Sequence, residues 1–208
     1  AVVGGYCIDQ IDAMGMEIIL NPEFNNTNMV STLFYAMDYI DENEDLLISY
    51  GDIIYERRIL ENLLQSDSPI SISVDRKWKI LWEARMENPL IDAETLKVNA
   101  YNRVLEVGKK PTGYNDIQGQ YMGLIKVRAD TVKKIHNFWK NLDKGAIYDG
   151  KNFKNMYMTS FLQCLIDNGI FIEAVFNDAG WIEIDSVNDL EFYNDLFLKN
   201  ELSKFIKL

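Results

Sequence analysis

The sequence has few of the residues on which several classes of protein depend. Only two of its 208 residues are cysteines and only one is a histidine. Cys7 and Cys164 lie far apart and have no C-x-x-C partner, which argues against a disulfide framework and against a zinc site. His136 has no matching serine or cysteine partner in the pattern of a hydrolase. Acyl-transfer chemistry is therefore a poor fit.

Positive charge and long apolar runs are also scarce. The chain has 21 Lys and Arg against 32 Asp and Glu, a formal net charge of −11, and no long basic stripe. Because that charge repels polyanions, we expect no nucleic-acid partner. No apolar run reaches the roughly 18 residues that span a bilayer, and no signal segment opens the chain. We expect a cytoplasmic protein with no membrane contact.

Apolar residues make up 48 % of the chain, enough for the core of one sizeable domain over residues 1–208. In the first third, short apolar segments alternate with segments of helical periodicity. This alternation predicts parallel β-α-β crossovers in a three-layer, Rossmann-like α/β fold with a mostly parallel sheet. The expected strands are 1–6, 16–20, 45–52 and 69–74, and the expected helices are 28–40 and 55–65. The continuous apolar run in 45–52 predicts a strand that is buried on both faces.

The pattern changes after Asp75. "TLKVN" and "RVLEVG" predict a hairpin and "GQYMGLIKV" a longer strand, so residues 76–127 are expected to form a small antiparallel β insertion. Helices are expected again over about 129–142 and 155–168, followed by the strand "FIEAVF", the segment "WIEIDS" and a closing helix at 187–198, capped by Ser186 or Asp185. The simplest description is one domain with an elaborated central lobe.

Two carboxylates leave apolar strands at widely separated places. Asp52 ends the run "LLISYGD", and Asp185 ends "GWIEID" just before the closing helix. At the end of a strand, Asp52 has three ordinary roles: helix cap, partner of a basic side chain, or ligand of a divalent cation. The carboxyl ends of parallel strands share one crevice, so both aspartates could reach the same ion. A hard cation such as Mg²⁺ takes one or two carboxylates, and waters and phosphates complete its coordination.

The segments around these aspartates carry a resemblance to a known family. "SYGDIIYE" and "WIEIDSVNDLEFY", together with "NNTNMVSTLFYAMDYI", "GKKP" and "GQYMGLIKV", resemble the nucleotidyltransferase family in its phosphocholine cytidylyltransferase-like branch. The resemblance implies a nucleotide-diphospho-sugar transferase-like fold. It also implies a reaction in which CMP passes from CTP to a small phosphorylated or phosphonylated acceptor, with Mg²⁺ as cofactor and pyrophosphate as product. Relatives of this kind serve capsule and lipopolysaccharide pathways.

The resemblance also implies roles for individual residues. The expected metal-binding and catalytic pair is Asp52 and Asp185, and Lys110 of "GKKP" would pair with a phosphate. The expected contacts with the nucleotide are Asn28, Ser31 and Gly51, and those with the acceptor are Trp78, Tyr157, Trp181 and Arg85. Each has an ordinary alternative: a helix cap for Asn28, a solvated surface position for Lys110, plain core for the aromatic residues. Phosphocholine, 2-aminoethylphosphonate and phosphoglutamine all remain open as acceptors.

One departure from the family pattern is clear. The family begins with a strand and a Gly-rich loop that cradles the triphosphate, and this sequence is expected to start at the family's second strand, as an N-terminally truncated domain. A sugar-1-phosphate nucleotidyltransferase and a non-catalytic nucleotide-binding module are therefore kept as alternatives. Apolar residues near the end, Phe192, Phe197 and Phe205, are expected to be exposed and to suit a homodimer.

Overall fold

The computed structural model describes residues 1–207 of the chain. Its strands are β1 (Val2–Gly4), β2 (Ile18–Leu20), β3 (Leu46–Ser49), β4 (Ile53–Tyr55), β5 (Ile70–Asp75), β6 (Leu96–Val98), β7 (Val104–Val107), β8 (Gln120–Val127), β9 (Ile147–Tyr148), β10 (Lys151–Asn152), β11 (Ile172–Asn177) and β12 (Trp181–Glu183). Its α-helices are α1 (Met29–Ala36), α2 (Arg57–Leu64), α3 (Trp78–Arg85), α4 (Ala129–Asn141), α5 (Met158–Asp167) and α6 (Val187–Leu198).

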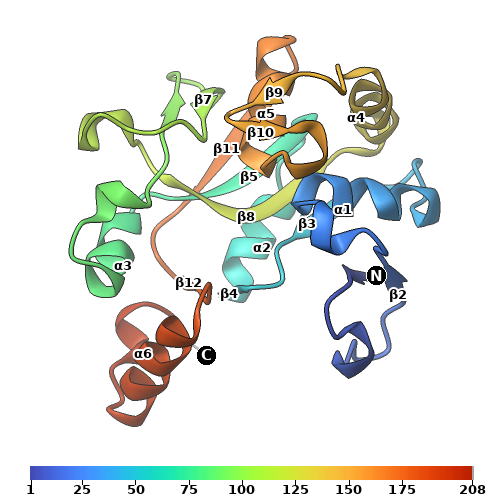
Figure 1. Ribbon diagram of the computed structural model, residues 1–208. Helices are drawn as coiled ribbons and strands as arrows, with labels where there is room; N and C mark the ends of the chain where they lie inside the picture. Colours follow the sequence, from blue (N-terminus) through green and yellow to red (C-terminus); the bar gives the residue numbers. More distant parts are fainter. Residues whose placement is uncertain (208) are drawn as a thin grey trace.

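A four-stranded sheet in the order β11-β5-β8-β3 forms the centre of the molecule (Figure 1). β11 runs parallel to β5, whereas β8 runs antiparallel to both β5 and β3. Three of the four strands therefore point the same way, and the helices between them make the crossovers. The predicted α/β class with a mostly parallel sheet is confirmed.

Two details of the prediction are wrong. "GQYMGLIKV" is β8, which lies between β5 and β3 in the central sheet, so the part of 76–127 that stands apart from the sheet ends before β8. β3 was expected to be buried on both faces, but it pairs only with β8, and its residues alternate between half-buried and exposed. An edge strand has one free side, and a short apolar run does not reveal its place in the sheet order.

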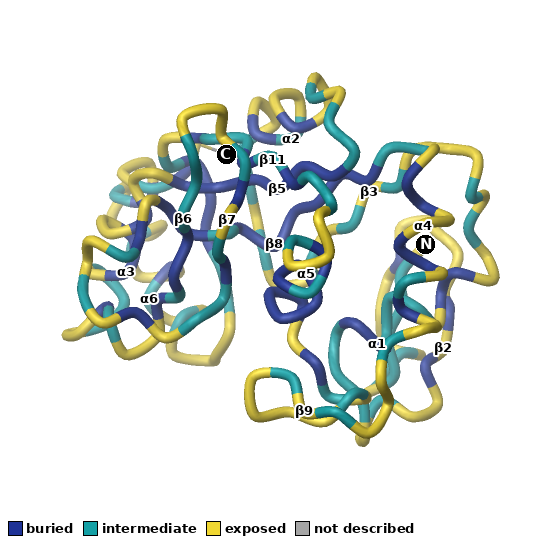
Figure 2. The backbone as a smooth tube through the Cα atoms, turned by 90° about the horizontal axis from the view of Figure 1, so that it is seen from above, coloured by how far each residue is buried: buried dark blue, intermediate teal, exposed yellow. Residues whose placement is uncertain are grey.

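Two hydrophobic cores lie on opposite faces of the sheet, because successive side chains of a strand point to opposite sides. In β8, Ile125 and Val127 join the core under α1, α4 and α5, whereas Met122 and Leu124 join the core of α2, α3 and α6. Figure 2 shows β5, β8 and β11 as the buried centre of the molecule. These helix, sheet and helix layers position the connections at the strand ends, where the site is found.

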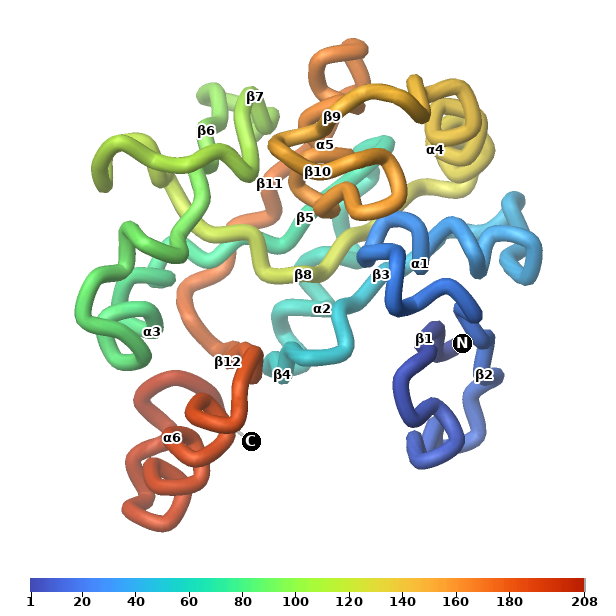
Figure 3. The backbone as a smooth tube through the Cα atoms, viewed as in Figure 1, coloured from blue at the N-terminus to red at the C-terminus, as the bar shows by residue number. Residues whose placement is uncertain are grey.

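Smaller two-stranded pairs surround the sheet. β4 and β12 pair antiparallel, as do β6 and β7, the predicted hairpin, while β1 and β2 form a separate parallel pair. Figure 3 shows β1 and β2 on one side of the molecule and α6 on the other. No helix among residues 1–207 is long and apolar enough to cross a membrane.

The C-terminal segment is more deeply buried than the sequence predicted. α6 begins with the predicted cap at Ser186, as a capping box completed by Asp189. Phe192 and Phe205 pack against the second core, and only Phe197, with 61 % of its surface exposed, faces solvent. The expectation of three exposed phenylalanines is therefore wrong for two of them, because the segment after α6 folds back over the helix.

Candidate active site

The pairing of β4 with β12 brings Asp52 and Asp185 to the same edge. Ile53 pairs with Glu183, and the N–H of Ile184 donates a hydrogen bond of 2.9 Å to the carbonyl of Asp52. This extends the ladder by one residue and puts Asp52 opposite Ile184, so that Asp185 lies diagonally across from Asp52 on the facing strand. The two aspartates are separated by 133 positions in sequence, but in the fold they lie close enough for the charge of Asp185 to raise the pKa of Asp52.

Two of the three roles considered for Asp52, helix cap and partner of a basic side chain, do not apply in this structure. α2 begins at Arg57 and its N-cap is Glu56, so Asp52 is not a helix cap. Among the described residues no cationic side chain forms an ion pair with Asp52. The third role considered for this carboxylate, ligand of a divalent cation, stays a prediction.

The electrostatics of this edge are those of crowded acids. The pKa of Asp52 is raised, first by burial and then by the negative charge of Asp185. The pKa of Glu183 is raised to about 7 by burial and by the charges of Asp185 and Asp52, which together outweigh the opposing effect of Arg85. Hard oxygen donors whose repulsion is only partly neutralised suit a divalent cation.

Arg85 lies beneath this edge rather than in an acceptor pocket. Only 4 % of its side chain is exposed, and it forms ion pairs with Glu183, Asp185 and Asp189. The expectation that Arg85 contacts the acceptor is corrected, since a buried guanidinium with three carboxylate partners has no free face for a substrate. Asp185 stays 48 % exposed, so its contact with Arg85 leaves it accessible from solvent.

The residues present suit a cation that shares its ligands with a substrate. Within residues 1–207 no cluster of three or more His, Cys, Asp or Glu side chains could hold a metal ion. Two carboxylates are, however, the usual protein contribution to a Mg²⁺ site in which nucleotide phosphates supply further oxygens. The donor set therefore fits a metal that arrives with a nucleotide and does not fit a closed structural site.

A bulge in β8 shapes the turn that carries Asp52. The register between β5 and β8 shifts near Gly123, which has a φ of +76°. The N–H of Tyr50 donates to the carbonyl of Gly123 at 2.9 Å. A Cβ added at Gly123 would lie only 2.8 Å from the Tyr50 ring. Glycine therefore serves both the backbone conformation and the approach of the ring. Tyr50, Gly51 and Asp52 are consecutive, so the bulge helps to place the carboxylate.

We expect Gly123→Ala to lower both stability and turnover. The left-handed backbone costs a residue with a Cβ roughly 1–2 kcal/mol, and overlap with the Tyr50 ring adds about 1–3 kcal/mol. Gly150→Ala is the matched control, because Gly150 has a φ of +80° but nothing within 4 Å of an added Cβ. Urea unfolding of both variants measures the difference. Equal losses in the two would show that the ring contact at Gly123 is unimportant.

A cavity of about 380 Å³ lies beside the β6-β7 hairpin. Its lining contains acids and bases together: Asp92, Glu94, Lys109, Lys110 and Asp149, with Ala93, Gly108 and Tyr157. Lys109 Nζ is 2.5 Å from Asp149 Oδ1, and Lys110 Nζ donates to the carbonyl of Ile91. Two residues expected from the sequence, Lys110 and Tyr157, thus share one cavity.

The Tyr50 hydroxyl is influenced by charges of both the cavity and the acidic edge. Burial raises the pKa of Tyr50, and so do the negative charges of Glu94, Asp52 and Glu183. One hydroxyl therefore lies within electrostatic range both of a carboxylate of the cavity and of the carboxylates of the edge. The Tyr50 and Tyr121 rings, 5.8 Å apart, pack edge to face in this region.

The other predicted acceptor aromatics lie in the core. Trp181 is 1 % exposed and its indole N–H donates to Asp75, while Trp78 packs edge to face against Trp82. The expectation that Trp78 and Trp181 contact the acceptor is corrected, because Trp78, which is 4 % exposed, and Trp181 both belong to the second core. Tyr157, which is 37 % exposed, is the predicted acceptor aromatic that lines the cavity.

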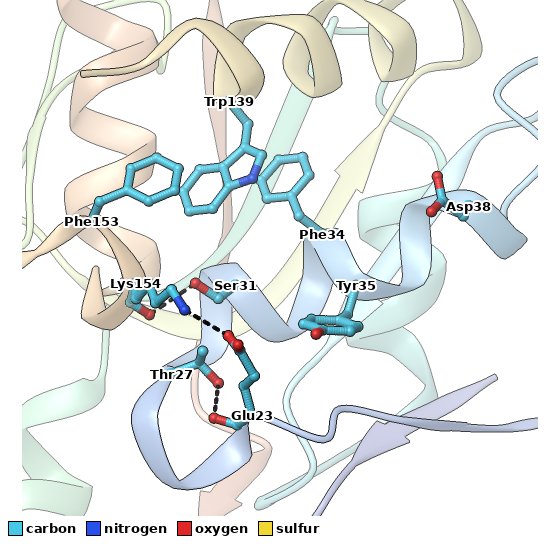
Figure 4. Close-up of a pocket in the computed structure, with 9 residues that line it drawn as sticks. All are labelled: Glu23, Thr27, Ser31, Phe34, Tyr35, Asp38, Trp139, Phe153 and Lys154. Carbon is cyan, nitrogen blue, oxygen red and sulfur yellow. Dashed lines mark hydrogen bonds and ion pairs between the residues drawn. The ribbon is translucent and has the colours of Figure 1, made fainter. Parts of the chain in front are cut away.

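A second cavity, of about 300 Å³, lies on the outer face of α1 and contains Ser31 (Figure 4). Trp139 stacks between Phe153, at 4.0 Å, and Phe34, at 4.7 Å, and Ser31 Oγ donates to the carbonyl of Lys154. At 100° per residue, Ser31 lies opposite Met29, whose sulfur contacts the Tyr50 hydroxyl. Ser31 therefore points away from Asp52, and a contact with a nucleotide bound there is not supported.

Asn28 is the N-cap of α1: its side-chain oxygen accepts from the N–H of Met29 at 2.8 Å. This is the ordinary role considered for it. Gly51 lies in the turn directly before Asp52, where an added Cβ would meet nothing within 4 Å. The open space at Gly51 leaves the backbone accessible to a ligand.

Sequence reasoning missed Glu94 and Glu183. In "WIEID" the side chains of Glu183 and Asp185 share one face of the strand because residues two apart point the same way. That alternation could have placed Glu183 at the edge. Glu94 has no such signal, since its burial depends on Gln120, whose side chain donates to the Glu94 carbonyl at 2.6 Å across 26 positions.

Comparison with known proteins places the chain in a family. No family model matches the sequence. It is 43 % identical over 201 residues to the CTP:phosphoglutamine cytidylyltransferase of Campylobacter jejuni, covering 92 % of this chain and 79 % of the relative.

Solved structures show the same fold. The inositol-1-phosphate CTP transferase of T. maritima matches with a TM-score of 0.65 and 18 % identity, over 92 % of this chain and 68 % of that one. A Bacillus anthracis protein assigned as a glucose-1-phosphate thymidylyltransferase matches with a TM-score of 0.60 and 13 % identity, over 88 % and 66 %. Because the Campylobacter jejuni relative is 43 % identical over most of both chains, the chain belongs to the nucleotidyltransferase family of enzymes, on its CTP-dependent cytidylyltransferase branch.

Proposed function

We propose that this protein transfers CMP from CTP to the phosphate of a small phosphorylated amino-acid amide, such as phosphoglutamine. The observation that supports the proposal is the position of Asp52 opposite Ile184 in the β4-β12 ladder, next to Asp185. An oxygen of the acceptor phosphate attacks the α-phosphorus of CTP, the new P–O bond forms, the bond to the β-phosphate breaks, and pyrophosphate leaves. The attacking oxygen is already anionic, so no general base is needed.

In this scheme the chain binds and orients two anions. Asp52 and Asp185 would hold Mg²⁺, which when bound neutralises the phosphate charge that develops during transfer. Gly51 leaves its backbone open beside them, and Lys110 supplies a positive charge in the adjoining cavity. Catalysis then depends on placement and on charge neutralisation.

The cavity favours an acceptor with the zwitterionic head group of an amino acid over choline phosphate. An amino acid presents an ammonium and a carboxylate, and the cavity lining presents both signs of charge, Glu94 and Asp92 against Lys109 and Lys110. A quaternary ammonium favours several aromatic faces, but two of the predicted aromatics are in the core. The acceptor named for the Campylobacter jejuni relative is of the zwitterionic kind.

We expect the affinity for the acceptor to depend on the ionisation of Glu94. Its pKa is raised, mainly by burial and also by the charges of Asp92 and Asp149. Only the ionised carboxylate pairs with an ammonium, so the KM for the acceptor should rise as pH falls through this raised pKa. Glu94→Gln should have a high KM at every pH. A KM profile of the wild-type protein that matches the flat profile of Glu94→Gln would contradict this role.

The acceptor can be identified by direct assay. The protein is incubated with CTP, Mg²⁺ and each of phosphoglutamine, phosphocholine, 2-aminoethylphosphonate and glucose 1-phosphate, and pyrophosphate release is measured. We expect phosphoglutamine to give the highest kcat/KM. Pyrophosphate release with glucose 1-phosphate alone would replace the proposal by a sugar-1-phosphate nucleotidyltransferase. A homodimer stays a prediction, and analytical ultracentrifugation of the protein tests it.

A further inference from the structure

We infer that Arg85 is a positioning residue, which fixes the Asp185 carboxylate in the orientation that binds a divalent cation. The inference rests on the proposed function, because it assigns Asp185 to that cation. It gives Arg85, the last residue of α3, a role that neither acceptor binding nor core packing provides.

The guanidinium of Arg85 contacts three carboxylates, which come from β12, from the connection after it and from α6. Its Nε donates to Asp189 Oδ1 at 2.9 Å, its Nη1 to Glu183 Oε2 at 3.4 Å, and its Nη2 to Asp185 Oδ2 at 2.5 Å. Arg85 ends α3, Glu183 ends β12, and Asp189 lies in the first turn of α6. One side chain therefore joins three elements at the edge that carries Asp52.

Two of these contacts hold the guanidinium, and the third presents a donor to Asp185. Asp189 is fixed by the capping box, in which its Oδ2 accepts from the hydroxyl of Ser186 at 2.7 Å. Glu183 is fixed by its pairing with Ile53 in the β4-β12 ladder. Because guanidinium donors lie in one plane at set angles, an arginine held at two points has its remaining donor direction set.

Asp185 itself lacks such support. It lies in the connection between β12 and α6, outside both elements, and is 48 % exposed. Within the described part of the chain, Arg85 is the side chain that hydrogen-bonds its carboxylate, and the contact uses Oδ2. Oδ1 is left for a cation. Groups that orient a metal ligand in this way typically affect affinity about 10–100-fold when changed.

Arg85 could instead act only as a competitor for Asp185, since its positive charge repels a cation. The two roles predict opposite results. A lysine keeps the charge but loses the planar set of donors, so Arg85→Lys isolates the geometry. A methionine removes the charge, so it would tighten metal binding if competition were the whole effect.

The test measures metal binding without turnover. Calorimetry gives the affinity of the protein for α,β-methylene-CTP with and without Mn²⁺, and the ratio of the two is the gain due to the metal. We expect Arg85→Lys to reduce this gain about 10–100-fold. Arg76→Lys is the matched control: it makes the same substitution at an arginine that pairs with Asp178 at 3.1 Å, outside the Arg85 cluster, and the gain should stay within about threefold of wild type.

Each outcome decides a different claim. A wild-type protein without a metal-dependent gain, or an Asp185→Asn variant that keeps it, removes the metal assignment and with it the proposed function. A gain that is lost in Asp185→Asn but unchanged in Arg85→Lys, increased in Arg85→Met, or equally reduced in Arg76→Lys overturns only the positioning role. If Arg85→Lys is unfolded by circular dichroism, Arg85→Met with Glu183→Gln keeps the net charge of the cluster and carries the same test.

Discussion

Replacing Asp52 or Asp185 by asparagine is expected to lower turnover by roughly 10³-fold or more. The neutral amide keeps the size of the side chain but loses the negative charge that holds the cation, which contributes several kcal/mol of charge stabilisation in the transition state, and each 1.4 kcal/mol is about tenfold in rate. Both positions are partly exposed. The free energy of unfolding should therefore change by no more than about 1–2 kcal/mol. Initial rates of pyrophosphate release and urea unfolding measure the two effects.

The control for these variants is Asp130→Asn. Asp130 is also an aspartate near a helix start, paired with Arg128 at 2.8 Å, but it lies at the beginning of α4 and has no part in the site. Its turnover should equal that of wild type. Full activity in Asp52→Asn or in Asp185→Asn would remove that residue from the metal site.

Arg85→Met is expected to destabilise the fold by about 3–5 kcal/mol, the usual cost of removing one partner from a buried ion pair. The loss leaves Glu183 and Asp189, both largely buried, without their positive partner. Adding Glu183→Gln should restore part of the stability, because it removes one of the uncompensated charges. Thermal or urea unfolding of the single and double variants gives the coupling energy between the two positions.

The direction of this coupling is the informative result. Glu183→Gln alone should be close to neutral or stabilising at pH 8, because the fold raises the pKa of Glu183 to about 7 and therefore opposes its ionisation. If Glu183→Gln worsens Arg85→Met, the carboxylate stabilises the fold in some way other than by its pair with Arg85, and the account of the cluster fails.

Local patterns in the sequence predicted most of the elements. The cap at Asn28, the helix 187–198 with its cap at Ser186 and the hairpin of "TLKVN" with "RVLEVG" all follow from residues close together in the chain. The approach of Asp52 to Asp185 was also expected, although 133 positions separate them in the chain. That expectation rested on the rule that strand ends converge, but the fold achieves it through the antiparallel β4-β12 pair beside the sheet.

What the sequence could not provide depends on contacts between distant residues. An arginine on a helix can face solvent, a substrate or a carboxylate, and only the position of β12 and α6 decides that Arg85 is buried. Likewise, a tryptophan suits a substrate cage and a core equally well, and Trp78 and Trp181 are buried because α3 and β12 both contribute to the second core. Sheet order has the same limit, as the central place of β8 shows.

A crystal structure with Mn²⁺ and α,β-methylene-CTP, with the ion located by its anomalous scattering, tests the central claim most directly. The account predicts one ion bound by carboxylate oxygens of both Asp52 and Asp185, at the roughly 2.0–2.2 Å expected for a small divalent cation, with nucleotide phosphate oxygens completing its coordination. An ion that contacts neither aspartate, or only one of them, would contradict it.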